Sequence, residues 1–295
     1  MLSALTAWKE TVTLTPFSGV QFLDFAFDPD ECRMKPRSFL ERRDTSVRTA
    51  DGAVRVVLHP LSGDPEKDAP FLDDRREEDV FYDISKVKAL EPFLGKWVPV
   101  PWLRIRPGRG PWGEEILDTG PTNWARVRVV PAEEKGPRGR TTHRAVFAFD
   151  TELAERVENR AYLVPSFKDA ENEQEFRFAA KPEDMAWYLA WPEQTAAGDP
   201  QKWVDDWLEE LFRELKQAQR PGRPLREEDF PYQREHWARY ITFLALLDEA
   251  LKLPKLRLLD TVSADRRYHP VNVDLVLDIG NSRTCGILIE TYPDK

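Results

Sequence analysis

The spacing of apolar residues changes along the chain, and this change constrains the fold more than any other feature of the sequence. Up to about residue 180, apolar and polar residues alternate with a period near two, which is typical of β-strands. Beyond that point apolar residues recur with the 3.6-residue period of a helix, most clearly over residues 199–215. The sequence therefore predicts an α+β fold in which a β-rich region, residues 1–180, precedes a helical region, residues 181–255.

The β-rich region is expected to form a mainly antiparallel sheet. Residues 11–15 and 19–27 flank a short break and are expected to pair as an N-terminal hairpin. Pro99 and Pro101 favour a sheet-edge position for the strand that contains them, because proline cannot donate a hydrogen bond to a neighbouring strand. A charged stretch, residues 73–79, is expected to be a solvated loop. The further strands are expected at residues 54–58, 97–105, 124–130, 144–149 and 174–179, the last closing the sheet.

Two helices are expected in the helical region, at about 200–218 and 233–251. Asp199 and Pro200 provide an N-cap and a first-turn proline for the first helix. The second is apolar on most sides and is expected to be buried, and a short proline-rich connection favours an antiparallel pair. The expected contacts involve Trp203, Trp207, Leu211 and Leu215 on one helix and Trp237, Ile241 and Leu244 on the other. Alternatively, Trp203, Trp207 and Trp237 form a docking surface for another protein.

Residues 271–289, VNVDLVLDIGNSRTCGILI, contain two β-rich runs around one polar turn. The expected structure is an antiparallel hairpin that pairs residues 273–278 with 285–289. Asp278 would stand at the end of a strand, and Gly280 would allow the backbone to approach a phosphate. Asn281, Ser282 and Thr284 would add hydrogen-bond donors. A plain hairpin turn built from the same residue types is the alternative.

This DxGxxxT pattern between apolar strands resembles the first phosphate motif of the actin, Hsp70 and sugar-kinase superfamily. The resemblance implies that residues 256–295 begin an actin-like ATPase domain, whose ribonuclease-H-like lobe starts with this hairpin. It also implies ATP and Mg²⁺ as cofactors, with Asp278 beside the cation through coordinated water. The positions that match the family motif are Asp278, Gly280, Asn281, Ser282 and Thr284.

A larger part of the chain is similar to the bacterial SrfB family of virulence factors. The similarity involves TVTLTPFSGVQFLDF near the N-terminus, the Trp- and Pro-rich sheet region, and VDLVLDIGNSRT near residue 280. It implies that this chain is the N-terminal portion of a longer, ATP-binding protein that acts as a nucleotide-dependent switch. Nucleotide binding by the chain alone would then be weak or absent, and hydrolysis absent. The alternative is a non-enzymatic interaction module that binds protein partners encoded alongside it.

Composition and missing motifs exclude several other classes of protein. With 43 Lys and Arg against 52 Asp and Glu, the formal net charge is -9, which opposes binding to nucleic acid or to an anionic membrane. Cys32 and Cys285 are too far apart in sequence for a zinc knuckle, and no secretory signal or transmembrane run is present. We therefore expect a cytoplasmic protein. The four histidines are too scattered to show metal-ligand spacing and are expected to be structural: His59, His143, His236 and His269.

Overall fold

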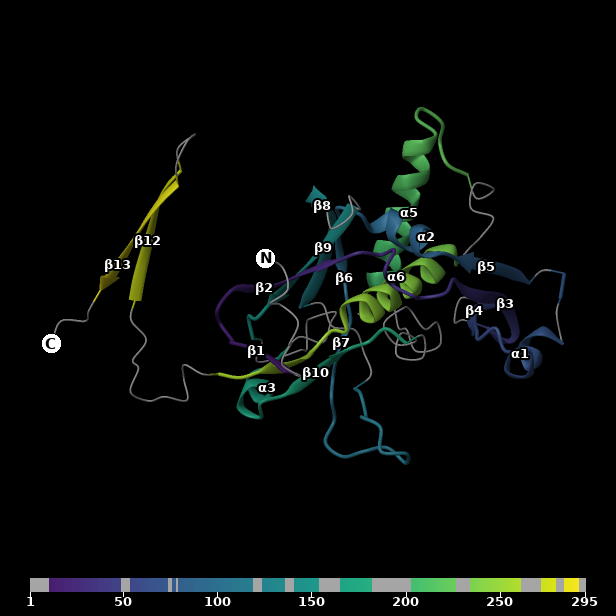
Figure 1. Ribbon diagram of the computed structural model, residues 1–295, viewed down its shortest axis with the longest axis horizontal. Helices are drawn as coiled ribbons and strands as arrows, with labels where there is room; N and C mark the ends of the chain where they lie inside the picture. The colour runs from purple at the N-terminus through teal and green to yellow at the C-terminus, as the bar shows by residue number, and fades with distance from the viewer. Residues whose placement is uncertain are drawn as a thin grey trace. The chain divides into compact units, whose positions relative to one another are not determined.

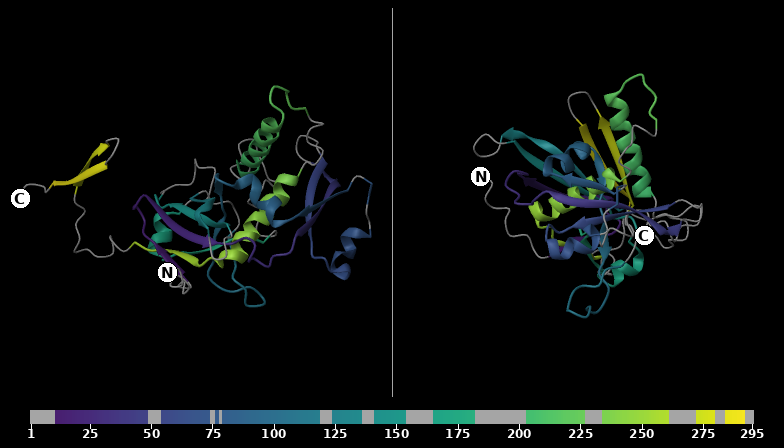
Figure 2. Two further views of the ribbon diagram at one scale, coloured as in Figure 1. Left: turned by 45° about the horizontal axis from the view of Figure 1, so that its top comes forward. Right: turned by 90° about the vertical axis from the view of Figure 1, so that its right-hand side faces the viewer.

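The chain folds as two compact units, Met1–Leu259 and Asp260–Lys295. The computed structural model describes most of the first unit and a hairpin of the second (Figures 1 and 2). The fold is mixed α and β with several antiparallel sheets, as the sequence predicts. The described residues are 11–48, 54–73, 76–77, 79–118, 124–135, 141–153, 165–181, 203–226, 234–260, 272–279 and 284–291.

One four-stranded antiparallel sheet contains two of the strands that alternation predicts most clearly. Strands β8 and β9 include the expected segments 124–130 and 144–149 and pair with each other. Alternate residues on these strands, among them Val127, Phe147 and Phe149, are fully buried. The order in the sheet is β2 (Val20–Phe27), β9 (Thr141–Asp150), β8 (Ala125–Lys135) and β6 (Trp97–Pro99).

A second four-stranded sheet joins distant parts of the sequence and corrects two predictions. The strand that contains the expected segment 11–15 pairs in parallel with a strand some 240 residues later. The prediction of an N-terminal hairpin was therefore wrong. The turn after β1 is held on the end of β9, since Phe17 N–H donates to Thr151 O and Thr151 N–H donates to Gly19 O. Strand β10 lies in this second sheet and does not close the first one. The order is β1 (Thr11–Leu14), β11 (Lys255–Leu258), β10 (Glu175–Phe178) and β7 (Trp102–Arg104).

The strand expected at residues 97–105 is divided between these two sheets. Its first part is β6 and its second part is β7, with Val100 and Pro101 between them. Each part lies at an edge of its sheet, which confirms the edge position predicted from the prolines. The prediction of one continuous strand was wrong, because the chain leaves the first sheet and enters the second at this point.

A three-stranded antiparallel sheet, in the order β4-β3-β5, contains elements that the sequence analysis missed. Strand β4 (Val54–Leu61) includes the predicted segment 54–58, whereas β3 (Arg37–Arg48) and β5 (Val80–Ile84) were not expected. Charged residues conceal β3 in the sequence. Arg42 on this strand pairs with the buried Asp79 at 2.8 Å, so the solvated-loop prediction is wrong for Asp79. Two short helices adjoin this sheet in sequence, α1 (Pro65–Leu72) and α2 (Lys86–Leu90).

Aromatic side chains fill the space between the two four-stranded sheets. Trp102 of β7 lies with its ring centroid 5.7 Å from that of Phe149 on β9 and 5.4 Å from that of Phe178 on β10. Trp124, which precedes β8, lies 4.8 Å from Phe176 of β10. These contacts join both sheets into one hydrophobic core. A short helix, α3 (Phe167–Glu171), precedes β10.

The two predicted helices are confirmed as α5 (Trp203–Gln219) and α6 (Glu235–Leu251). Helix α6 is largely buried, and its Tyr240 hydroxyl donates to Pro99 O at 2.6 Å. The buried face of α5 is formed by Val204, Leu208 and Leu211. None of the helices in the described ranges combines the length and apolarity needed to cross a bilayer.

The two tryptophans of the helix pair whose side chains the structure describes do not form an exposed surface. Trp237 is 7% exposed, which confirms packing for this residue and makes the docking-surface alternative wrong for it. Trp207 is partly buried and stacks against Phe93 of η1 (Glu91–Phe93), with ring centroids 6.5 Å apart. The side chain of Trp203 lies outside the described part of the structure.

Candidate functional site

The predicted phosphate loop belongs to a hairpin in the second unit. Strands β12 (Asn272–Ile279) and β13 (Thr284–Thr291) pair antiparallel over their whole lengths, which confirms the expected hairpin. Asp278 is the last but one residue of β12, and Thr284 is the first residue of β13. The register therefore brings these two predicted site residues to the same end of the hairpin. The other three predicted residues lie outside the described part: Gly280, Asn281 and Ser282.

A hairpin of this kind suits an anion site for a simple geometric reason. The register of β12 and β13 leaves a short connection of four residues, 280–283, between the two strands. Amide groups in such a connection can point toward phosphate oxygens, and a carboxylate at the end of the incoming strand can hold a hydrated cation. The observed register is compatible with both roles. Binding of phosphate or magnesium at this hairpin stays a prediction.

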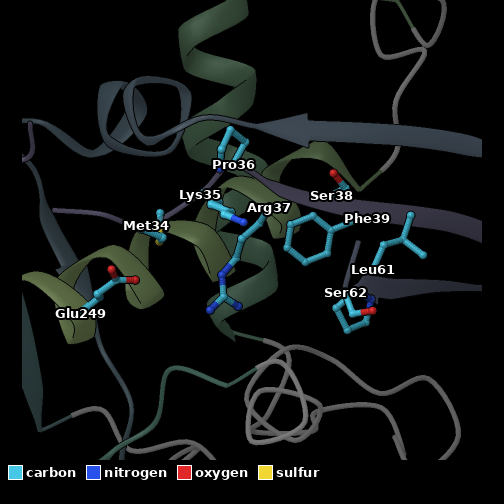
Figure 3. A pocket seen from close by; sticks show the side chains of 10 residues that line it. Met34, Lys35, Pro36, Arg37, Ser38, Phe39, Leu61, Ser62 and Glu249 are labelled. Carbon is cyan, nitrogen blue, oxygen red and sulfur yellow. The ribbon is translucent and has the colours of Figure 1, made fainter. Parts of the chain in front are cut away.

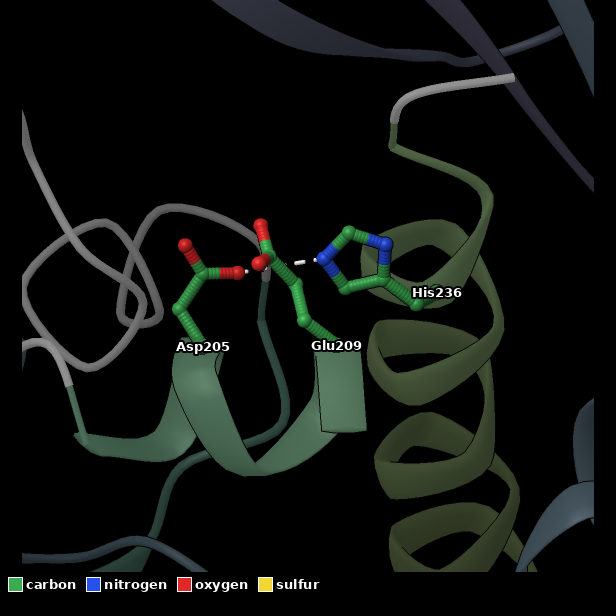
Figure 4. A group of neighbouring side chains, drawn as sticks. All are labelled: Asp205, Glu209 and His236. Carbon is green, nitrogen blue, oxygen red and sulfur yellow. Dashed lines mark hydrogen bonds and ion pairs between the residues drawn. The ribbon is translucent and has the colours of Figure 1, made fainter. Parts of the chain in front are cut away.

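A second group of polar side chains lies between α5 and α6 in the first unit (Figure 4). Asp205 and Glu209 are four residues apart on α5, so they lie on the same helix face. His236, in the first turn of α6, faces them, and its Nε2 lies 3.1 Å from Asp205 Oδ1. One potential ligand atom from each of the three side chains lies within 4.8 Å of the other two. The residue types and distances are those of a possible metal site.

Two residues at the start of α6 complete this polar group. The Trp237 indole Nε1–H donates to Asp205 Oδ1, the same oxygen that faces His236. Arg234 lies beside both carboxylates, with Nη1 3.6 Å from Glu209 Oε1 and 4.0 Å from Asp205 Oδ2. Its guanidinium carbon stands 4.3 Å from the centroid of the Trp237 ring. The group therefore combines two carboxylates, one imidazole and one cation.

Asp205 is ionised at neutral pH although it is buried. Burial by itself would raise the pKa of the Asp205 carboxyl, but the hydrogen bond with His236 and the charge of Arg234 outweigh it, so that the pKa falls below its usual value. The carboxylate form is the one that accepts hydrogen bonds from both Trp237 and His236. The same form is required of a metal ligand.

Glu41 of β3 lies at the N-terminus of α6 and is buried. Its Oε2 accepts a hydrogen bond from Arg234 N–H at 3.2 Å and another from the Tyr82 hydroxyl. Burial and the neighbouring Glu41 carboxylate raise the pKa of Tyr82, which keeps the phenol protonated as a donor. The positive end of the helix dipole also stabilises a carboxylate at this position. The contact therefore fixes α6 against the three-stranded sheet.

A surface hollow of about 380 Å³ lies between β3, β4 and the C-terminal part of α6 (Figure 3). Its charged lining residues, Lys35, Arg37 and Glu249, are of both signs, so the hollow has no marked preference for an anion or a cation. Met34, Phe39 and Leu61 add apolar surface. The lining offers no arrangement of groups that indicates a particular reaction.

The sequence analysis missed the group around Asp205 because its members come from two helices. His236 was assigned a structural role, since the four histidines show no ligand spacing among themselves. A signal was nevertheless present in the carboxylates, because Asp205 and Glu209 are spaced by four residues in a segment predicted to be helical. The first turns of α5 and α6 meet here, so the antiparallel pairing predicted for the two helices is wrong. Only this meeting places His236 opposite the two carboxylates, 31 residues along the chain from Asp205.

The comparisons with known proteins identify the family of the chain but no closer relative. The chain matches no curated protein and no solved structure. The model of one protein family, described as virulence factor SrfB, matches residues 1–295. This match extends over both units, and it agrees with the resemblance found at the two ends of the sequence. The chain belongs to the SrfB family of virulence factors.

Proposed function

We propose that the β12–β13 hairpin supplies the first phosphate loop of an actin-like nucleotide site. The observation that carries this proposal is the antiparallel register of β12 and β13, which leaves a four-residue connection between Ile279 and Thr284. The segment DIGNSRT occupies this position in the sequence. In the actin-like superfamily, a motif of this form joins the first two strands of the nucleotide-binding lobe.

The proposed roles follow from the chemistry of each residue. Asp278 holds a hydrated Mg²⁺, since magnesium keeps several waters and is bound through few protein carboxylates. Gly280 allows the backbone to approach the phosphate, and amides of the connection point toward its oxygens. The further hydrogen-bond donors are Asn281, Ser282 and Thr284. The protein then acts as a switch, because ATP between two lobes favours their closure.

Residues 1–295 are expected to have no ATPase activity by themselves. Phosphoryl transfer requires positioning and charge stabilisation from several directions at once, and the hairpin provides one of them. We propose that sequence beyond this segment supplies the second phosphate loop and the group that orients the attacking water. A turnover assay of residues 1–295 with Mg²⁺ and ATP should match buffer.

The experiment for the proposed function uses the longer protein that this proposal requires. Asp278→Ala should abolish ATP hydrolysis or reduce it by at least about tenfold, because the hydrated cation loses its carboxylate. Asp274→Ala is the matched control, since it removes the same charge from the same strand four residues farther from the turn. Equal activity in both variants would contradict the assignment of Asp278.

A non-enzymatic interaction module is the second candidate function, and one observation favours it. Trp112 is 90% exposed in the segment that connects β7 to β8. Its backbone is held in place, since Gly110 N–H donates to Glu114 O and Trp112 N–H donates to Glu114 Oε2. An ordered and exposed tryptophan is a common anchor in protein interfaces.

If proteins encoded beside this chain bind here, Trp112→Ser should abolish their co-purification, whereas Val87→Ser, at another exposed apolar residue, should not.

A further inference from the structure

The polar group between α5 and α6 has the composition of a metal site. Asp205, Glu209 and His236 provide two carboxylates and one imidazole, and Zn²⁺ accepts both kinds of ligand. With metal–ligand bonds of about 2.0–2.1 Å in a tetrahedral site, two ligand atoms stand about 3.3 Å apart. The observed 3.1 Å between His236 Nε2 and Asp205 Oδ1 is close to that separation. We propose that these three residues bind a zinc-class dication that links α5 to α6.

The surroundings of Asp205 resemble the outer shell of a metal site. Trp237 Nε1–H donates to Asp205 Oδ1, which fixes the orientation of the carboxylate. Within the described ranges, no group donates a hydrogen bond to the second oxygen, Oδ2, and the nearest cationic atom is Arg234 Nη1 at 4.0 Å. A buried carboxylate whose second oxygen lacks a donor can accept a metal bond at little cost. Asp205 can therefore bind the ion through Oδ1, which faces His236 Nε2, and add a second bond through Oδ2.

The different exposed fractions of the three side chains are also suitable for a metal site. His236 and Asp205 are buried, with side chains 8% and 5% exposed, so they provide a rigid inner wall. The side chain of Glu209 is 44% exposed and lies at the rim. A metal ion can therefore enter past Glu209, and solvent water can complete its coordination. Three protein ligands and one open position are typical of accessible zinc sites.

Arg234 distinguishes this proposal from a purely structural role of the group. In the structure its guanidinium balances the two carboxylates, but 3.6 Å and 4.0 Å separate the charged atoms, and no hydrogen bond joins them. Arg234 Nε is buried and has no hydrogen-bond partner among the described residues. The guanidinium stacks on Trp237 and can move to solvent, since its side chain is 20% exposed. A dication at the carboxylates would replace Arg234, so the two should compete.

Calorimetric titration with Zn²⁺ tests the site in the whole chain, with folding checked by circular dichroism. The wild-type chain should bind one equivalent that His236→Gln and Glu209→Gln weaken by at least about tenfold each, because even outer-shell changes commonly cost about 10- to 100-fold. Glu209→Gln keeps the test valid if His236→Gln unfolds, since Glu209 is exposed. Glu235→Gln is the matched control, because Glu235 pairs with Arg239 and should leave zinc affinity unchanged.

Arg234→Gln provides the second arm of the experiment. Competition predicts a zinc affinity at least about threefold higher than that of the wild type, whereas a simple structural brace predicts no zinc binding in either chain. The proposal is overturned if the wild-type chain binds no zinc, or if Glu209→Gln binds it as tightly as the wild type. Unchanged zinc affinity in Arg234→Gln would also overturn it, because the guanidinium and the metal would not share the carboxylates.

Discussion

Asp205 shows how one residue connects two helices. It is buried on α5, yet its carboxylate interacts with His236, Trp237 and Arg234 around the start of α6. Without it, His236 Nε2 and Trp237 Nε1 would lose this hydrogen-bond partner, and Arg234 would keep only Glu209 as a nearby carboxylate. Removing one member of a buried polar network costs more than the network contributes as a whole, because the remaining members stay desolvated.

Asp205→Ala should therefore destabilise the first unit by about 3 kcal/mol or more. Glu210→Ala on the same helix is the control, since Glu210 is exposed and its replacement should change the free energy of unfolding by less than about 0.5 kcal/mol. Urea denaturation followed by tryptophan fluorescence measures both. Similar midpoints for the two variants would show that the contacts of Asp205 contribute little.

The Arg42–Asp79 pair predicts a specific pH dependence. Burial favours a higher pKa for Asp79, but hydrogen bonds from Arg42 and from Arg76 N–H, with the charge of Arg42, lower it below the usual value of 3.8. A lowered pKa in the folded state means that the stabilisation is present above pH 3.8 and is lost as the pH falls through the lowered value.

Asp79→Asn should lower the free energy of unfolding at pH 7, and its difference from the wild type should shrink below pH 3.8. Chemical denaturation at a series of pH values measures this difference. Asp73→Asn, at an exposed position nearby, should differ little from the wild type at any pH. A difference for Asp79→Asn that stays constant down to about pH 2 would contradict the assigned pairing.

At the scale of elements, local patterns predicted the helices and the β12–β13 hairpin but not which apolar residues of α5 are buried most deeply. The contacts expected on α5 were those of Trp203, Trp207, Leu211 and Leu215, of which Leu211 is buried. In the structure Val204 and Leu208 are fully buried, whereas Trp207 lies at the border and stacks on Phe93. A helical period gives the apolar face of a helix, but which part of that face is deepest depends on neighbours that are distant in sequence, here η1 and α6.

Leu208→Ala should cost about 2–5 kcal/mol, because it leaves a cavity between α5 and its neighbours. Trp207→Ala should cost less than the roughly 3–5 kcal/mol typical of a fully buried tryptophan, since part of the ring is already in water. Thermal and urea melts of these variants measure the loss of stability in each. A larger loss for Trp207→Ala than for a buried aromatic such as Phe243→Ala would show that the stack on Phe93 is more protected than its exposure indicates.

At the scale of the whole molecule, the first unit depends on contacts between its two ends. Strand β1, residues 11–14, pairs with β11, residues 255–258, and Leu14, Leu256 and Leu258 are buried there. Alternation predicted the first of these strands but not its pairing, because a period of two carries no information about a partner. The same limit explains why the division of the strand at residues 97–105 was not predicted. It also explains why the polar group between α5 and α6 was missed, since its members meet only after the helices pair.

Truncation tests the division into two units. A chain that ends at Leu259 keeps β11 and should melt within about 2 °C of residues 1–295, because an isolated two-stranded hairpin is only marginally stable. A chain that ends at Leu253 lacks β11 and should melt far lower or fail to fold. Differential scanning calorimetry compares the three chains. A large loss of stability on removing residues 260–295 alone would show that the second unit supports the first.

The central claim is that the connection between β12 and β13 binds phosphate, and amide NMR of the labelled chain tests it most directly. Titration of residues 1–295 with Mg-ATP to millimolar concentrations should shift the amide resonances of Gly280, Asn281 and Ser282, with the weak affinity expected of one loop. Adenosine with Mg²⁺ should not shift them, and Asp274→Ala should leave the response intact, whereas Asp278→Ala should remove it. A response that persists in Asp278→Ala, or an equal response to adenosine with Mg²⁺, would contradict the proposed nucleotide site.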